Sequence, residues 1–232
     1  MPGFSGFSHD LPTFLGELRD NNNKAWFDEN RDRYEHVYLD PAKAFVAAIA
    51  PELHSVSPAI AAEPRVNGAV MRVNRDIRFS KDKTPYKTTM DIHFVEGTTK
   101  LKSNPAYLFR FTADAFYIGA GAHGFNKAQL AAWREALVDD GAGGAFRQAL
   151  SAASKVGYAE PGGQHYKTVP RGLPPDHPNA EFLRFNMFYL TKEEKPAPKA
   201  LFTPEAVDFC MAEFRALRPV QNWLVEHVGD RA

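Results

Sequence analysis

Residues 89–121 read TMDIHFVEGTTKLKSNPAYLFRFTADAFYIGAG, and the spacing of their apolar side chains indicates the fold class. Met90, Ile92 and Phe94 alternate with polar or smaller neighbours, as side chains do in a strand that is buried on one face. The same period of two returns twice further on, and Ala113-Asp114 forms a short connection between the second and third runs, which is typical of a β-hairpin. We therefore expect antiparallel strands at about 69–79, 89–96, 105–112 and 115–121.

The sequence before these strands has helical periodicity. Leu11, Phe14 and Leu18 recur at the spacing of one helix face. Start signals for three helices follow the rules of helix capping, and they lie at Asp10, Asn23 and Asp40-Pro41. The pattern predicts a helical region over residues 8–57, with the third helix ending near Val56.

The second half of the chain predicts further helices and one more strand. We expect helices within 126–153, a long loop rich in Gly and Pro at 157–181, a strand at 182–190, and a helix at 203–228 capped by Thr203-Pro204. No internal repeat or linker is visible. The sequence thus predicts a single α+β domain over 1–232. Its antiparallel sheet has about five strands, with N-terminal helices packed on one face and further helices after the sheet.

The composition favours a globular protein of the cytoplasm. Apolar residues make up 44% of the chain and charged residues 24%, which is ordinary for a folded domain. The N-terminus resembles no signal peptide, and the longest apolar run, Phe45–Ala50, is far too short to cross a membrane. Cys210 is the only cysteine and forms no internal disulfide, so we expect a small buried side chain rather than a nucleophile.

Charge is distributed unevenly along a chain whose formal net charge is zero. Residues 1–63 contain five Lys/Arg and ten Asp/Glu, whereas residues 64–110 contain ten Lys/Arg and only four Asp/Glu. Such an excess creates a positive field over one part of the surface. We therefore expect partners to bind there.

The basic segment contains an unusual motif, Arg72-Val-Asn-Arg-Asp-Ile-Arg-Phe-Ser-Lys-Asp-Lys-Thr-Pro-Tyr-Lys87. It resembles the signature R-x-x-R-D-x-R-F-x-x-D-K-x-x-Y of the family known as domain of unknown function 2461, which contains uncharacterised, mainly bacterial proteins. Other similar features are Asn22 with Trp26-Phe27, a Gly-x-Gly after a strand, and Pro-Arg-Gly-Leu before Asp176-His-Pro178. The resemblance covers nearly the whole chain and implies no particular activity.

The motif is suited to binding a small anion. Guanidinium groups match carboxylate and phosphate oxygens, and lysines add point charges. The expected anion-binding residues are Arg72, Arg75, Arg78, Lys83, Tyr86 and Lys87, with Asp76 and Asp82 orienting them. The ligand would carry phosphate or carboxylate, with or without catalysis. In the structural alternative, the same acids and bases only pair with one another to stabilise a turn.

Other functions are less well supported. Nucleic acid is a further alternative for the basic segment, with Phe79, Tyr86 and Tyr107 available for stacking, but the neutral net charge makes it unlikely. Gly119-x-Gly-x-x-Gly124 matches a dinucleotide-binding pattern without its parallel context, so a tight turn is favoured. His93 lies two residues after Asp91, as a base and its orienting carboxylate would, although an isolated strand histidine is the commoner case. The spacings predict no metal and no cofactor, and the oligomeric state is left open.

Overall fold

The computed structural model describes residues 3–97, 103–158 and 160–229, and within them a six-stranded sheet forms the centre of the molecule. The strand order is β1-β2-β3-β4-β6-β5, and all neighbouring strands are antiparallel. The strands are β1 (Ile60–Ala61), β2 (Met90–Glu96), β3 (Ala106–Phe111), β4 (Phe116–Ala122), β5 (Pro161–Gln164) and β6 (Phe185–Glu194). The predicted α+β class and single domain are confirmed, with one strand more than expected.

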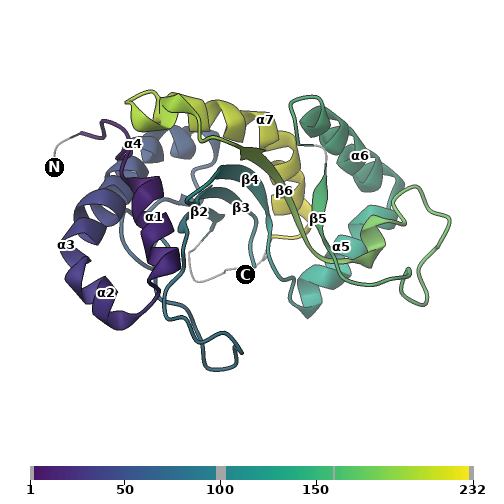
Figure 1. Cartoon of the computed structure of the whole chain (residues 1–232). Coiled ribbons are helices and arrows are strands. Elements are labelled where there is room, and N and C mark those ends of the chain that lie inside the picture. Colours follow the sequence, from purple (N-terminus) through teal and green to yellow (C-terminus); the bar gives the residue numbers. More distant parts are fainter. Residues whose placement is uncertain (1–2, 98–102, 159, 230–232) are drawn as a thin grey trace.

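The helices form two groups and one long crossing helix (Figure 1). Those before the sheet are α1 (Leu11–Asp20), α2 (Lys24–Glu29), α3 (Arg31–Arg33), a π-helical turn (Tyr34–Leu39) and α4 (Asp40–Val56). Those after it are α5 (Lys127–Val138), α6 (Asp140–Ser154), two 3-10 turns (Phe182–Arg184 and Lys199–Phe202) and α7 (Ala206–His227). Among the described residues, none of these helices is both long and apolar enough to cross a membrane.

Of the three predicted N-terminal start signals only Asn23 forms a cap, since α4 continues directly from the π-helical turn, with Leu39 at its N-cap position and no side-chain cap. Asn23 caps α2 by accepting a hydrogen bond from the Trp26 amide at 3.0 Å, and α4 begins at Asp40. The Asp10 side chain does not cap α1 and instead binds Arg33 at 2.8 Å. Both Asp10 carboxylate oxygens accept from Arg33, and no side-chain cap of α1 is formed.

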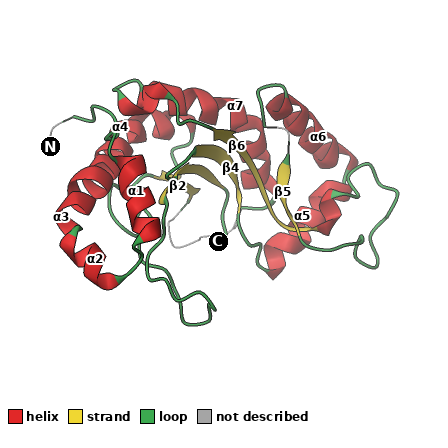
Figure 2. Cartoon of the chain, in the orientation of Figure 1, coloured by secondary structure: helices red, strands yellow, loops and turns green. Residues whose placement is uncertain are grey.

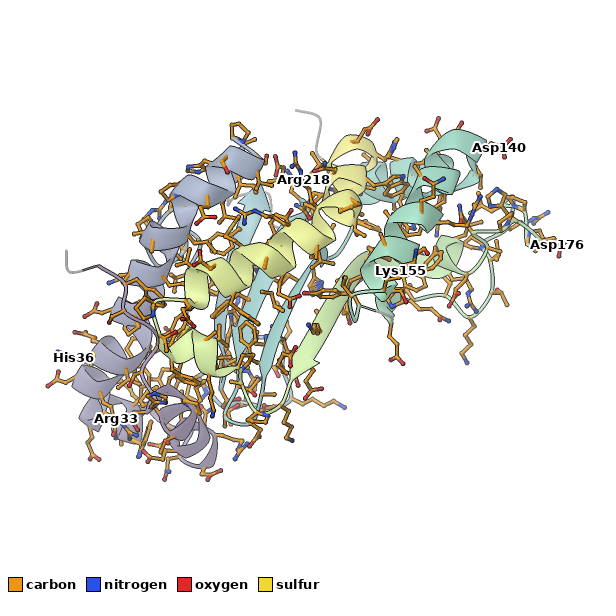
Figure 3. The ribbon with its side chains drawn as sticks, turned by 90° about the horizontal axis from the view of Figure 1, so that it is seen from above. Arg33, His36, Asp140, Lys155, Asp176 and Arg218 are labelled. Atoms are coloured by element: carbon orange, nitrogen blue, oxygen red, sulfur yellow. The ribbon has the colours of Figure 1, made fainter. Side chains whose placement is uncertain are left out.

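One face of the sheet is covered by α4 and α7. Phe45 of α4 packs on Phe94 and Phe109, with ring centroids 6.5 and 5.0 Å apart. Phe214 of α7 packs on Phe94 and Tyr107 at 5.9 and 4.6 Å. Figure 3, which looks down on the molecule from above, shows α7 lying across the strands. These aromatic contacts bury the alternating apolar positions that predicted the strands.

The strand expected at 69–79 is wrong. The described residues there form isolated bridges alone, Val70 with Val66 and Ile92, and Asn74 with Tyr86, and the segment is drawn as a loop in Figure 2. Because most side chains from Arg72 onward are polar and remain exposed, the segment offers no apolar face to bury against the sheet. The place beside β2 is taken in part by β1, which was not expected.

Three other expectations need correction or fall outside the structure. The loop expected at 157–181 contains the short strand β5, and α7 begins at Ala206 rather than at Thr203. The fifth expected strand is β6, which begins at Phe185 after a 3-10 turn. Lys100 and Lys102, counted in the basic segment, lie outside the described residues.

Candidate functional site

The motif at residues 72–87, which we call the basic loop, projects from the body of the molecule between β1 and β2 (Figure 1, blue). Its two arms run beside one another. The Arg75 amide donates to the Pro85 carbonyl at 2.8 Å, and the Lys87 amide donates to the Val73 carbonyl at 2.7 Å. The basic loop is therefore an irregular hairpin with hydrogen-bonded arms rather than an open surface segment.

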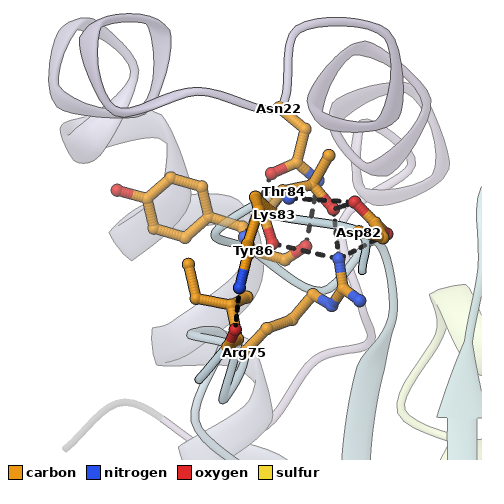
Figure 4. A network of polar contacts seen from close by, with 7 residues as sticks. Asn22, Arg75, Asp82, Lys83, Thr84 and Tyr86 are labelled. Carbon is orange, nitrogen blue, oxygen red and sulfur yellow. Dashed lines mark hydrogen bonds and ion pairs between the residues drawn. The ribbon is translucent and has the colours of Figure 1, made fainter. Parts of the chain in front are cut away.

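Arg75 is used inside the basic loop. Its Nη1 donates to Asp82 Oδ2 at 2.6 Å, to the Thr84 carbonyl at 3.0 Å and to the Thr84 hydroxyl (Figure 4). The hydrogen bond from the Thr84 amide, with those from Thr84 Oγ1 and Arg75, lowers the pKa of Asp82. Lys83 Nζ donates to the Ile77 carbonyl at 2.9 Å. These contacts close the loop, as the structural alternative predicted.

Arg78 pairs with the other acid of the motif. Its Nε and Nη2 donate to the two Asp76 oxygens at 3.0 and 2.7 Å, and these bonds lower the pKa of Asp76. Both side chains are solvent-exposed, so the pair contributes little to stability. Arg72 is exposed and makes no hydrogen bond or ion pair with another described residue. The expected anion-binding residues thus fall into separate pairs, and anion binding by them as one group stays a prediction.

Tyr86 is part of the core rather than of a binding surface. Its ring is buried and stacks on Phe27 at 4.1 Å, and its main chain forms two hydrogen bonds with the Asn22 side chain, at 2.9 and 3.0 Å. Tyr107 is also buried. Of the three aromatic residues considered for base stacking, only Phe79 is accessible, and its side chain is 95% exposed.

The face of the sheet opposite α4 and α7 carries a second group of polar residues. Strand alternation puts Asp91, His93 and Val95 of β2 on this face. Three rows of residues that pair across β2, β3, β4 and β6 cross this face, and we number them from the start of β2. Row one is Asp91, Arg110, Tyr117 and Glu193; row two is His93, Leu108, Gly119 and Thr191; row three is Val95, Ala106, Gly121 and Tyr189.

Apart from Asp91, Glu193 and Gly119, the residues of these rows line a cavity of about 550 Å³, which we call the sheet-face cavity. Its polar lining residues are His93, Asn104, Arg110, Tyr117, His123, Tyr189 and Thr191. Its apolar lining includes Met71, Val95, Ala106, Leu108 and Met187. No Asp or Glu is among the described residues that line it. A mainly apolar cavity with a few polar groups is typical of small-molecule sites.

Asp91 holds Arg110 at the edge of the cavity. The carboxylate is 4% exposed, and it accepts from Arg110 Nε at 2.5 Å and from the Thr89 hydroxyl at 3.0 Å. Lys87 Nζ lies 3.7 Å from Asp91 Oδ2. Burial alone would raise the pKa of Asp91, but the nearby cations Arg110 and Lys87, together with His93, outweigh it and lower the pKa. Asp91 is therefore ionised at neutral pH and orients the guanidinium.

Arg110 keeps donors for a ligand. Its side chain is 51% exposed, and only Nε is used in a hydrogen bond with the described residues. The terminal nitrogens Nη1 and Nη2 are thus available. A guanidinium fixed on one edge and open on the other is suited to bind two oxygens of a carboxylate or phosphate.

His93 lies in the second row as a neutral imidazole. Burial lowers its pKa to about 4; Asp91 opposes that shift, while Arg110, Lys87 and His123 add to it. The ring makes no hydrogen bond to another described residue, and the Asp91 oxygens accept from Arg110 and Thr89. The pair of a base and its orienting carboxylate considered from the sequence is therefore not formed.

The glycine pattern has a packing role. Gly119 and Gly121 lie within β4, where an added Cβ would come within 2.1 Å of the Leu190 carbonyl oxygen and 2.4 Å of the Phe188 carbonyl oxygen. Only Gly124, with φ of +76°, lies in the turn that precedes α5. The strand before this turn is antiparallel to its neighbours, so the parallel context of a dinucleotide site is absent here.

Other chemistry receives little support within the described residues. No group of three His, Cys, Asp or Glu side chains there is placed to hold a metal ion. Cys210 is fully buried, and burial raises the pKa of its thiol well above the usual value. It is the small core residue that was expected.

The sequence drew attention to His93 but not to Arg110, Tyr117 and Tyr189 as site residues. These three become neighbours of His93 only once β3, β4 and β6 are aligned in register. The alternation of Arg110 with Phe109 and Phe111 was a signal for its face, but not for its partner across the strands.

The chain was compared with known proteins in three ways. A family model described as a conserved hypothetical protein, DUF2461, matches residues 10–223. No significant match is found among the curated proteins or among the solved structures. The matched range includes the basic loop and every residue of the three rows.

Proposed function

Within the DUF2461 family of conserved hypothetical proteins, to which this chain belongs, we propose that the protein binds a small anionic organic molecule in the sheet-face cavity. The observation that carries the proposal is the lining itself. It contains the guanidinium of Arg110 and no carboxylate among the described residues, and it is large enough for a small ligand. The ligand class is the one expected from the sequence, and its place is the sheet rather than the basic loop.

Arg110 would bind the anionic group. Asp91 fixes the guanidinium through Nε, so the side chain loses little additional freedom when Nη1 and Nη2 bind a ligand. Asp91 neutralises one positive charge, and Lys87, 3.7 Å from the same carboxylate, supplies a second. Arg110, Lys87 and Asp91 together carry one positive charge, and Glu193 of the same row, which accepts from the Tyr117 hydroxyl, offsets it, so the ligand would bind through the Nη1 and Nη2 donors rather than through a net charge.

His93 and the tyrosines would add specificity. A neutral imidazole presents one donor and one acceptor, and it carries no charge that would compete with Arg110. Tyr117 is occupied by its bond to Glu193 at 3.0 Å, whereas Tyr189 and Thr191 line the opposite side of the cavity. Nothing in this arrangement requires a chemical step, and the proposal is one of binding.

The test is a thermal-shift comparison of organic carboxylates and phosphate monoesters with their neutral amide or alcohol analogues. A ligand present at about ten times its Kd stabilises the native state by about 1.4 kcal/mol, which raises the melting temperature of a chain of this size by roughly 3–5 °C. Arg110→Gln should abolish that increment.

Arg215→Gln is the matched control, because Arg215 is 54% exposed and also pairs with a single carboxylate, that of Glu52. It should keep the full increment. The proposal is wrong if no anion raises the melting temperature of the wild type more than that of the Arg110→Gln variant. It is also wrong if the neutral analogues raise the melting temperature as much as the anions do.

A further inference from the structure

The sheet-face cavity changes character along the strands. Row one contains the charged pair of Asp91 and Arg110. Row two is mixed, because Leu108 lies between His93 and Gly119. Row three has no charged side chain and presents Val95, Ala106 and Gly121 beside Tyr189. Polarity therefore falls from the first row to the third and rises again beyond it, where Asn104 and His123 line the cavity.

The size of this gradient follows from strand geometry. Adjacent rows are two residues apart, so rows one and three are separated by about 13 Å at about 3.3 Å per residue. An extended chain of about eight carbon atoms, together with the hydrogen bond of about 2.9 Å that joins its carboxylate to Arg110, is comparable with that distance. Over the far part of this length the floor has a small side chain at Ala106, and Gly121 lets the β6 backbone and Tyr189 approach closely.

Apart from Phe109, the apolar side chains that line the cavity do not belong to the core between the sheet and the helices α4 and α7. Leu108 is only partly buried and lies on the face opposite α4 and α7, whereas its strand neighbours Tyr107 and Phe109 belong to the core. Met71 and Met187 lie on other parts of the cavity wall. Flexible, polarisable methionine side chains adapt to apolar ligands of varied shape.

We propose that the ligand is amphipathic: a carboxylate bound at Arg110, with a flexible apolar body of about eight carbons lying over Leu108 toward Gly121. This inference rests on the proposed function, since it names the class of the anion bound in the same cavity. The apolar body accounts for the half of the cavity that a small inorganic anion would leave empty.

The experiment is calorimetric titration with straight-chain carboxylates from acetate to decanoate, with octan-1-ol as the uncharged comparison. Each methylene group that enters the cavity should tighten binding by up to about fourfold, and the gain should stop near octanoate. Leu108→Gln should flatten this dependence on chain length, because it replaces the apolar side chain over which the proposed ligand lies. Leu150→Gln, at a partly buried position on α6, is the control and should leave the whole series intact.

The outcomes separate the two proposals. If Arg110→Gln weakens all acids alike but wild-type affinity does not depend on chain length, the amphipathic ligand is refuted and the anion site survives. If no acid binds in a way that depends on Arg110, both fail. If octan-1-ol binds as tightly as octanoate, the cavity is an apolar site and the carboxylate has no part in it.

Discussion

Replacing Arg110 by Gln would leave the Asp91 carboxylate without its main cation, although the carboxylate is only 4% exposed. A hydrogen bond to a charged group contributes about 1.5–3 kcal/mol, and breaking a fully buried ion pair costs about 3–5 kcal/mol. The lower range applies here, because Arg110 is half exposed and because Thr89 and Lys87 remain beside Asp91. We therefore expect Arg110→Gln to lower the free energy of unfolding by about 1.5–2.5 kcal/mol.

Urea unfolding followed by the fluorescence of the three Trp residues measures this change. The control is again Arg215→Gln, which breaks an exposed ion pair and should cost at most about 1 kcal/mol. The double variant Arg110→Gln with Asp91→Asn should recover part of the loss, because no buried charge then lacks a partner.

The effect should also depend on pH. The pKa of Asp91 is lowered in the native protein, so its contribution to stability is present above the unfolded-state pKa and is lost as the pH falls through the folded-state value. The difference between wild type and Arg110→Gln should thus be full at pH 7 and shrink in acid. The reasoning is refuted if Arg110→Gln lowers the free energy of unfolding no more than Arg215→Gln does. It is also refuted if the loss caused by Arg110→Gln is the same at acid pH as at pH 7.

Three further predictions concern other parts of the chain. Phe79→Ser should change the free energy of unfolding by no more than about 0.5 kcal/mol, because the ring is 95% exposed, and a larger loss in urea unfolding would show that the ring packs against something. Asn22→Ala removes both hydrogen bonds to the Tyr86 main chain and should cost about 1–3 kcal/mol, with faster proteolysis inside residues 72–87 that limited digestion would detect. Cys210 should resist a thiol reagent in the native protein and react once urea unfolds it; rapid native labelling would contradict its burial.

The parts of the fold that the sequence predicted are those with a strong local signal. Met90, Ile92 and Phe94 alternate over a whole strand, and Asp40-Pro41 starts α4 at the expected residue. The strand β5 was missed because Pro161-Gly-Gly-Gln164 carries no apolar alternation and is held by its pairing with β6. The strand predicted at 69–79 is wrong because the arms of the basic loop are hydrogen-bonded mainly to each other, and the ion pairs of Arg75 and Arg78 lie within the loop.

The candidate site was harder to predict because it depends on contacts between distant segments. His93 and Arg110 share a face, but the connection between β2 and β3 does not specify which residues lie opposite each other. Tyr189 and Thr191 come from β6, about 70 residues beyond β4 in sequence, so their place beside Gly121 and Gly119 follows only from the sheet order. The excess of charge at residues 72–87 was the stronger local signal, and it drew attention to the basic loop instead.

A two-dimensional ¹H–¹⁵N NMR titration with octanoate tests the central claim most directly, because it reports where the ligand binds. The account predicts that the largest shifts fall on the amides of His93, Leu108, Arg110 and Gly121, that the amides of the basic loop tip at 76–83 stay unchanged, and that Arg110→Gln removes the shifts. Shifts concentrated at 72–87, with the amides of the sheet-face cavity unchanged, would contradict the account and assign the anion to the basic loop.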